Sequence, residues 1–417
     1  MRASNRHPKV HTELGTAPQT QPLIGKFDNP VMRRVRYGPG AIEHLAADIK
    51  ELGGTRVMIV ASSHLAKETD LVKRVEKLLG GAHVGTYTGI AQHEPRQGVF
   101  EGAEMARRLK ADFIVSFGGG SPIDAVKMIT MCLSEGVSTR EQLDKYVIRF
   151  EYPDKLYIPP MNASAVPHLA ISTTLSAGEF SNFAGALNEE TQTKELYIGD
   201  KLMARGVILD PAMTIHTPAW LWGSSGLRAI DHCVETFLSR SRMPFTDAIS
   251  TQALSLLIAN LAAATRDPKN LAARGACQVG SWMSLYALNN VVLGLSHGIG
   301  HQLGGAFNVT HGVTSAIMLP WVMEYNMAVT MDRQKPLAAA VGVDTAGMSD
   351  EQAGCAAVAV LRALVKELKL PSTLREVNVP KEGFKKLVDG TMVDLLVATN
   401  PRPVTPDDVY ALLEKAY

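Results

Sequence analysis

The feature that most constrains the fold of this 417-residue chain is a change of hydrophobic pattern near residue 205. Before that point, short β-branched runs alternate with amphipathic stretches, whereas after it the patterns are helical and mostly long. Strands that alternate with helices indicate a parallel sheet covered by helices. We therefore expect an α/β N-terminal domain with a parallel sheet over residues 29–205 and an all-α C-terminal domain over residues 206–417. Residues 1–28 are polar and aperiodic, and we expect a flexible N-terminal tail there.

The individual elements follow from the same patterns. The expected strands are 56–61, 83–87, 113–117, 169–173 and 206–209. The expected helices are 41–52, 71–79 and 97–109 in the first half and 221–239, 244–264, 270–293, 337–341, 349–368 and 406–415 in the second. Ligands tend to bind at the carboxyl ends of parallel strands and between domains, so we expect a site there.

Composition excludes several classes of function. The formal net charge of +1 provides no field that would recruit nucleic acid or an anionic membrane surface. The sequence contains no run of about 18 apolar residues, which a membrane-spanning helix would need, and it shows no secretory signal at its start. We therefore expect a cytoplasmic protein. The cysteines lack CxxC spacing and are expected to be reduced and buried: Cys132, Cys233, Cys277 and Cys355.

Three histidines in residues 293–311 form the most distinctive polar cluster of the helical half. His297 and His301 stand four residues apart, so on a helix both imidazoles project from one face. His311 follows after a Gly-Gly pair that can end or bend that helix. Neutral imidazoles bind metals and also act as general acids and bases, and this spacing allows both interpretations.

A glycine-rich turn follows the strand expected at 113–117. Three glycines precede Ser121 and the start of a helix, with Pro122 at a position that helices favour. Such a turn can hold the pyrophosphate of a dinucleotide against a helix N-terminus, or it can be an ordinary tight turn. Asp124 and Lys127 are three residues apart on the new helix. They can form an intrahelical ion pair, or Asp124 can accept a hydrogen bond from a nicotinamide.

Two further polar segments can likewise have either an ordinary structural role or a role in ligand binding. Hydroxyl side chains in residues 172–176 can cap a helix or line a cofactor. In residues 225–235, Arg228 and His232 share one helix face at a spacing of four, and His232 alone is more typical of an ordinary helix histidine than of a ligand.

Together, these motifs resemble the iron-containing (group III) alcohol dehydrogenase family. The resemblance rests on GGGSPIDAVK, STTLSAGE, SGLRAIDHCVE, LGLSHGIGHQLGGAFNVTHG and ATNPRP, in this order, and covers the chain from about residue 33. It implies a dehydroquinate-synthase-like α/β domain that binds NAD or NADP, a helical catalytic domain and a homodimer. The STTLSAGE segment, HEP at 93–95 and DHCVE at 231–235 are most similar to the maleylacetate reductase branch.

The resemblance also implies roles for individual residues. Gly119, Gly120 and Ser121 would hold the pyrophosphate, and Asp124 would meet the nicotinamide end of the cofactor. Thr173 and Thr174 would line the cofactor, and Lys194 would contact its ribose side. His301 matches the histidine beside the substrate, a candidate proton donor. The implied metal ligands are His232, His297 and His311. Ser62 occupies a position that is often Asp when NAD is strictly preferred, so NADP remains permitted.

Arg228 departs from the family pattern, because the family has an aspartate metal ligand at this position. Repulsion between a guanidinium and a 2+ ion about 4 Å apart is roughly 8 kcal/mol at an effective dielectric constant near 20. Asp231 projects about 100° away around the helix and is a poor substitute. We therefore expect Fe²⁺ or Zn²⁺ to bind weakly or not at all, and Arg228 to polarise a substrate carbonyl or pair with a substrate carboxylate.

The sequence thus predicts an NAD(P)-dependent alcohol dehydrogenase or carbonyl reductase acting on a small substrate, which can be carboxylated. Maleylacetate-type oxoacid reduction is the leading specific activity. A glycerol dehydrogenase-like enzyme or a dehydroquinate synthase-like lyase is the alternative, although these relatives need the acidic ligand that Arg228 replaces. A catalytically inactive NAD(P)-binding protein is a third possibility. Four histidines in one apolar region argue against it, because idle polar groups are costly to bury.

Overall fold

A six-stranded parallel sheet forms the first half of the computed structural model, which describes residues 26–29, 31–91, 94–151, 155–161, 166–191, 193–286 and 290–417. The strand order is β1-β10-β7-β4-β2-β3. The strands are β1 (Arg34–Tyr37), β2 (Val57–Ala61), β3 (His83–Tyr87), β4 (Phe113–Gly118), β7 (His168–Ser172) and β10 (Gly206–Leu209). The five expected strands are all present, and β1 was not expected. The predicted parallel sheet is confirmed.

Helices cover both faces of the sheet because alternate residues of each strand point to opposite sides. On β2, Met58 and Val60 pack with α4 (Arg96–Leu109) and α5 (Gly120–Ser134). Val57 and Ile59 pack on the other side with α1 (Leu45–Glu51) and α3 (Leu71–Leu79). The shorter helices of this half are α2 (Ser63–Glu68) and α6 (Arg140–Leu143).

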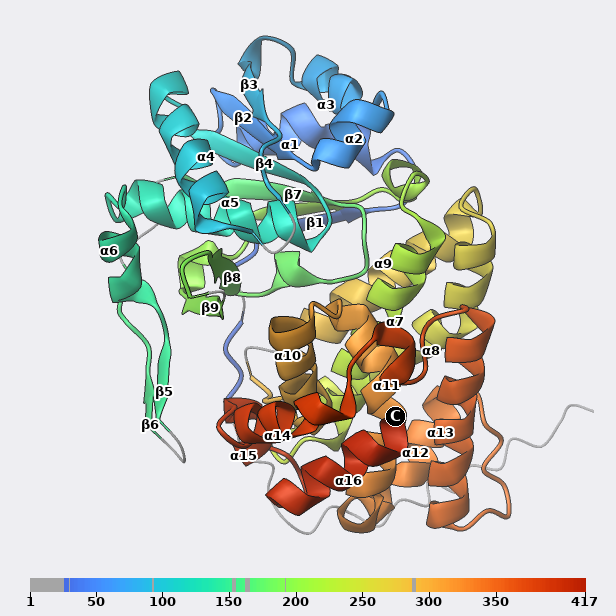
Figure 1. Cartoon of the computed structure of the whole chain (residues 1–417). Coiled ribbons are helices and arrows are strands. Elements are labelled where there is room, and N and C mark those ends of the chain that lie inside the picture. The colour runs from blue at the N-terminus through green and yellow to red at the C-terminus, as the bar shows by residue number, and fades with distance from the viewer. Residues whose placement is uncertain are drawn as a thin grey trace, which may run out of the picture.

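Two short antiparallel hairpins interrupt the α/β pattern, and neither was expected. One pairs β5 (Arg149–Glu151) with β6 (Lys155–Tyr157), and the other pairs β8 (Phe183–Asn188) with β9 (Thr193–Ile198). In Figure 1 the β8–β9 hairpin lies between the sheet and the helices of the second half. It can therefore present side chains to both parts of the molecule.

The second half is helical, as predicted. Its helices are α7 (Ala219–Leu238), α8 (Pro244–Arg266), α9 (Leu271–Tyr286), α10 (Leu295–Phe307), α11 (His311–Asn326), α12 (Gln334–Ala340), α13 (Asp350–Glu367), α14 (Phe384–Met392), α15 (Leu395–Ala398) and α16 (Pro406–Ala416). The helix expected over residues 270–293 is shorter than predicted, because α9 ends at Tyr286. These helices pack below the sheet in Figure 1, which gives the chain two distinct parts.

Three expectations need correction. The boundary at residue 205 is misplaced, because β10 pairs with both β1 and β7 inside the sheet. The tail expected over residues 1–28 does not extend to its last residues, since Phe27 packs against Phe245 at a ring-centroid distance of 4.8 Å. Cys355 is exposed, whereas the other three cysteines are buried as expected.

One described helix, α8, is long and apolar enough to cross a membrane by length and composition alone. Its Leu254, Leu257 and Leu261 are buried in the same hydrophobic cluster as α7 residues. A core helix of a helical domain meets the same test, so this is weak support for a membrane span.

Candidate active site

The glycine turn and the hydroxyl segment lie against each other at the carboxyl ends of β4 and β7. Thr173 N–H donates to Gly118 O at 2.9 Å. A Cβ on Gly119 would lie only 2.9 Å from Thr174 Cγ2, so the absence of a side chain permits this close approach. Gly118 has φ of +149°, which favours glycine. Gly119 is the N-cap of α5, and Ser121 lies in its first turn rather than capping it.

Lys127 has a structural role, as its buried position indicates. Its Nζ donates to Gly178 O at 2.6 Å, to Phe183 O at 2.7 Å and to Ser181 Oγ at 2.9 Å. It lies 3.6 Å from Asp124 Oδ1, which matches the intrahelical ion pair considered for these two residues. Lys127 therefore holds the loop before β8 against α5.

The β8–β9 hairpin brings Lys194 close to this turn. Lys194 Nζ donates to Glu94 Oε2 at 2.9 Å. Burial opposes the charge of Lys194, but Glu94 and Asp124 outweigh it and raise the pKa of the ammonium group. Asp124 Oδ2 accepts a hydrogen bond from Gly185 N–H at 3.3 Å, which ties α5 to β8. His93, part of the same sequence motif as Glu94, lies outside the described residues.

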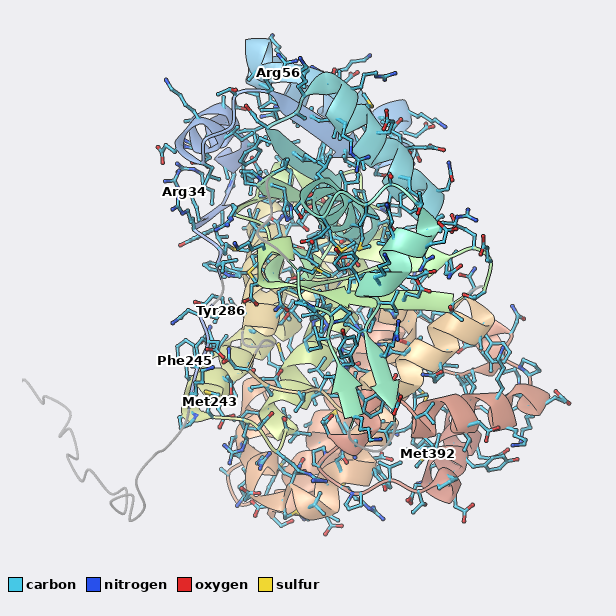
Figure 2. All side chains as sticks on the ribbon, turned by 90° about the vertical axis from the view of Figure 1, so that its left-hand side faces the viewer. Arg34, Arg56, Met243, Phe245, Tyr286 and Met392 are labelled. Carbon is cyan, nitrogen blue, oxygen red and sulfur yellow. The ribbon has the colours of Figure 1, made fainter. Side chains whose placement is uncertain are left out.

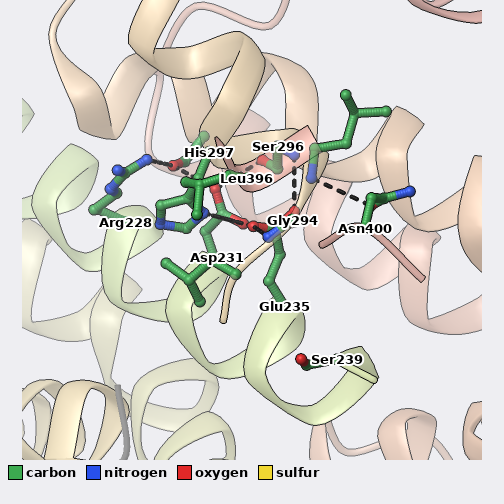
Figure 3. Close-up of polar contacts among 12 residues, drawn as sticks. Arg228, Asp231, Glu235, Ser239, Gly294, Ser296, His297, Leu396 and Asn400 are labelled. Atoms are coloured by element: carbon green, nitrogen blue, oxygen red, sulfur yellow. Dashed lines mark hydrogen bonds and ion pairs between the residues drawn. The ribbon is translucent and has the colours of Figure 1, made fainter. Parts of the chain in front are cut away.

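On the helical side, α7 carries a buried acidic network (Figure 3). Asp231 Oδ2 accepts hydrogen bonds from Ser296 Oγ at 2.8 Å and from Ser315 Oγ at 2.7 Å. Burial, together with the neighbouring Glu235, raises the pKa of Asp231 to about 8. Arg228 Nη1 donates to the same Ser315 Oγ at 3.4 Å. Ser315 therefore links the cation to the carboxyl group one turn away.

Glu235 anchors the start of α10. Its two oxygens accept hydrogen bonds from Gly294 N–H and Ser296 N–H, both at 2.8 Å. Its Oε2 also lies 2.7 Å from His297 Nδ1. Burial raises the pKa of this carboxyl group, although the two backbone donors act against the shift. Sequence reasoning considered Asp231 only as a substitute ligand and assigned no role to Glu235, which orients His297.

Of the three histidines implied as metal ligands, His232 and His297 are buried and His311 is partly exposed. His232 Nδ1, His297 Nε2 and His311 Nδ1 are buried atoms with no hydrogen-bond partner among the described residues. Burial holds the pKa of all three imidazoles well below the usual range, and the Arg228 charge lowers each pKa further. These imidazoles are therefore neutral, in a region of positive potential.

Neutral imidazoles suit a metal, but the rest of the arrangement does not fit one. Among the described residues, the set whose ligand atoms lie within 4.8 Å of one another is Asp231, Glu235 and His297, not the three histidines. In that set, both Glu235 oxygens and one Asp231 oxygen already accept hydrogen bonds. Arg228 is a permanent cation beside the same groups. We conclude that the residues present do not fit a divalent ion.

His301 differs from the other histidines because its side chain is 32% exposed, against 2% for His297. Its Nδ1 lies 2.9 Å from Asp394 Oδ2. It packs against His311 with ring centroids 6.2 Å apart. His301 is therefore more accessible to a ligand than the buried His232 and His297. Asp394, which sequence reasoning missed, stands in a segment without a recognisable motif.

The cofactor side and the histidine side face one shared region. Burial is the main cause of the low pKa of His311, and both Arg228 and Lys194 lower it further. Lys194 comes from the β8–β9 hairpin of the α/β half and Arg228 from α7, so a cation from each half lowers the pKa of this imidazole. The structure therefore places residues predicted for the cofactor side and for the histidine side near one another, where the two parts of the chain meet.

Comparison with known proteins gives matches to both halves of the chain. A model of the iron-containing alcohol dehydrogenase family matches residues 32–211, and a model of the C-terminal region of the same family matches residues 223–417. Lactaldehyde reductase of Escherichia coli (strain K12) is 30% identical over 91% of this chain and 97% of its own.

Two solved structures extend the comparison. A 1,3-propanediol oxidoreductase structure is 28% identical, with a TM-score of 0.87 over 94% of this chain and 100% of its own. The maleylacetate reductase of Agrobacterium tumefaciens is 23% identical, with a TM-score of 0.76 over 95% of this chain and 98% of its own. At that identity, the second likeness supports the fold alone.

Proposed function

Because this chain belongs to the iron-containing alcohol dehydrogenase family, we propose that it is an NAD(P)-dependent oxidoreductase that interconverts a small alcohol and its carbonyl compound. The observation that carries the proposal is that Arg228, whose Nη1 would lie 3.8 Å from a Cβ on Gly300, stands beside the helix that carries His297 and His301. An inactive binding protein has no need of cations and neutral imidazoles in one buried region, since each of them is costly to bury.

The glycine turn suits a dinucleotide. Gly119 and Gly120 lack the side chains that would fill the space against Thr174 and Ser176, and the positive end of α5 starts there. Gly119, Gly120 and Ser121 would hold the pyrophosphate, Thr173 and Thr174 would line the cofactor, and Asp124 and Lys194 would meet its nicotinamide and ribose. When bound, NAD(P)H supplies a hydride to the carbonyl carbon.

In this proposal, Arg228 performs the role that a metal has elsewhere in the family. Its guanidinium donates a hydrogen bond to the carbonyl oxygen and stabilises the negative charge that develops there. His301 then gives a proton to that oxygen, so that the carbonyl compound, hydride and proton become the alcohol. The neutral His232, His297 and His311 surround the reacting group without adding charge.

Arg228 has an alternative role with an anionic substrate. Its guanidinium would then pair with a substrate carboxylate through two parallel hydrogen bonds. Among family activities, reduction of a maleylacetate-type oxoacid fits this charge pattern best. A glycerol dehydrogenase-like or dehydroquinate synthase-like activity fits it less well, because Arg228 opposes the metal that those relatives use.

The proposal is tested by elemental analysis of the purified protein together with NAD(P)H oxidation on a panel of carbonyl compounds, with and without a chelator. We expect less than stoichiometric Fe or Zn, activity that the chelator does not change, and preference for oxoacids over uncharged aldehydes. Stoichiometric Fe or Zn in the wild type would contradict the metal-independent mechanism.

The variant Arg228→Asp tests the role of the cation directly. We expect it to lose most carbonyl reduction, by about 10²-fold or more, since it removes the group that stabilises the developing charge. Arg108→Asp is the matched control, because Arg108 is exposed on α4 and the charge change is identical. Full activity of Arg228→Asp without gain of a metal would refute the proposal.

A further inference from the structure

His301 is held by a carboxylate from a different helix. Asp394 precedes α15, and its Oδ2 lies 2.9 Å from His301 Nδ1 on α10. Its Oδ1 accepts a hydrogen bond from Leu396 N–H at 2.9 Å, which caps α15. Gln302 Nε2 donates to Oδ2 at 3.3 Å. Asp394 is only 13% exposed, so three contacts fix a mostly buried carboxylate against the imidazole.

This contact determines which nitrogen of His301 is available. A carboxylate accepts hydrogen bonds, so Nδ1 carries a hydrogen and donates it to Asp394. Nε2 is then the nitrogen that remains available to a ligand. Arg228 lies near the same helix, since a Cβ on Gly300 would be 3.8 Å from Arg228 Nη1. The guanidinium therefore lies beside the helix that carries His301.

We propose that Asp394 is a positioning residue for the proton transfer by His301, an inference that rests on the proposed function. In carbonyl reduction, the Nε2–H bond of the imidazolium breaks and its electron pair stays on nitrogen, while a new O–H bond forms on the substrate oxygen. In alcohol oxidation the proton returns to Nε2. Asp394 accepts the Nδ1 hydrogen in both directions and so keeps the ring in the orientation and tautomer that both directions require.

The variant Asp394→Asn separates this role from the capping of α15. The amide oxygen can still accept from Leu396 N–H, and Asn is as good an N-cap as Asp. The amide nitrogen, however, presents N–H groups to His301, so Nδ1 must accept and the hydrogen moves to Nε2. We expect kcat to fall by about 10²-fold or more, with the KM for NAD(P)H changed by less than about threefold.

The tautomer itself is a second readout that does not need turnover. In ¹⁵N-histidine NMR of the full chain, we expect neutral wild-type His301 to be protonated on Nδ1 and Asp394→Asn to be protonated on Nε2. Asp394→Glu, which restores a carboxylate, should recover the wild-type tautomer and part of kcat. The His301→Ala variant assigns the signal.

Asp389→Asn is the matched control, because Asp389 is an exposed carboxylate on α14 that pairs with Lys385 at 2.8 Å. It should keep kcat within about twofold. Unchanged kcat in Asp394→Asn, or a wild-type His301 protonated on Nε2, would overturn the inference. A wild type that oxidises no NAD(P)H with any carbonyl compound would instead refute the proposed function, while the NMR result would still report on the Asp394 contact.

Discussion

At the scale of single residues, Ser62 is the position that we expect to affect the choice between NAD and NADP. Ser62 follows β2, and its Cβ would lie 3.1 Å from a Cβ placed on Gly118, so it borders the glycine turn. A carboxylate there would repel a 2′-phosphate. We therefore expect Ser62→Asp to lower kcat/KM with NADPH by on the order of tenfold relative to NADH. Steady-state kinetics with both cofactors measures the ratio, and Ser62→Asn is the uncharged control. An equal loss with both cofactors would contradict this placement.

His168, at the start of β7, links stability to pH. Burial lowers the pKa of this imidazole to about 4, and its Nε2 lies 2.9 Å from Leu202 O. The unfolded chain binds a proton near pH 6.5 and the folded chain only near 4, so stability falls as pH decreases through this window. Between pH 7 and 5, His168 should cost about 2 kcal/mol of unfolding free energy.

His168→Gln, whose amide can still donate to Leu202 O but does not titrate, isolates this contribution. Urea unfolding at pH 7 and pH 5 should show a smaller loss in the variant than in the wild type. The comparison is needed because Glu179, whose pKa burial raises to about 7, contributes with the opposite sign over the same range. Equal losses in both proteins would show that His168 does not titrate as we expect.

The sequence predicted the residues of the site better than their contacts. Arg228 was identifiable because one position of a known motif carried the wrong charge. Asp394 was not, because it lies almost a hundred residues from His301 and in no motif. Its contact depends on how α10 packs against α14 and α15, and this long-range packing leaves no local signal.

At the scale of elements, the packing of α7 against α11 sets the position of Arg228, on α7, relative to His311, at the start of α11. A Cβ on Gly312 would lie 2.1 Å from Ser224 O, a backbone atom that cannot turn aside. We therefore expect Gly312→Ala to lower the free energy of unfolding by about 3 kcal/mol, at the upper end of overpacking costs. The urea midpoint measures it.

Gly305→Ala is the matched control on the neighbouring α10. A Cβ there would meet nothing within 4 Å, and alanine in a helix is favoured over glycine by about 0.5–1 kcal/mol. If the Gly312→Ala protein has the same free energy of unfolding as the wild type, α7 and α11 can move apart without a loss of stability.

The elements that the sequence predicted are those with strong periodicity. Strands such as β2 and β4 are buried on both faces and appear as continuous apolar runs, so their positions followed directly. The four-residue β1, which is only partly buried, and the two hairpins carry weak patterns and were missed. The boundary error at β10 has the same origin, because a strand that returns to the sheet just before the helical half gives no sign of its partners.

At the scale of the whole molecule, the segment before β1 joins the helical half to the edge of the sheet. Phe27 lies against Phe245 at the start of α8 and stacks with Tyr286 at the end of α9, with a centroid distance of 6.3 Å. Figure 2 shows Phe245 and Tyr286 as neighbours on one face. Asp28 and Asn290 exchange two hydrogen bonds, Asp28 N–H to Asn290 Oδ1 at 2.6 Å and Asn290 Nδ2 to Asp28 O at 3.0 Å.

These contacts of Phe27 and Asp28 are connected to the active site along the chain, because Asn290 directly precedes the segment that leads into α10 and His297. A double-mutant cycle on Phe27→Ala and Phe245→Ala measures the coupling free energy between these two side chains. We expect a coupling of about 0.5–1.5 kcal/mol, typical of aromatic pairs, from urea unfolding of the four proteins. The cycle of Phe245→Ala with Tyr410→Ala, on the separate helix α16, should be additive. If the Phe27–Phe245 cycle is equally additive, the N-terminal segment does not fasten the two halves together.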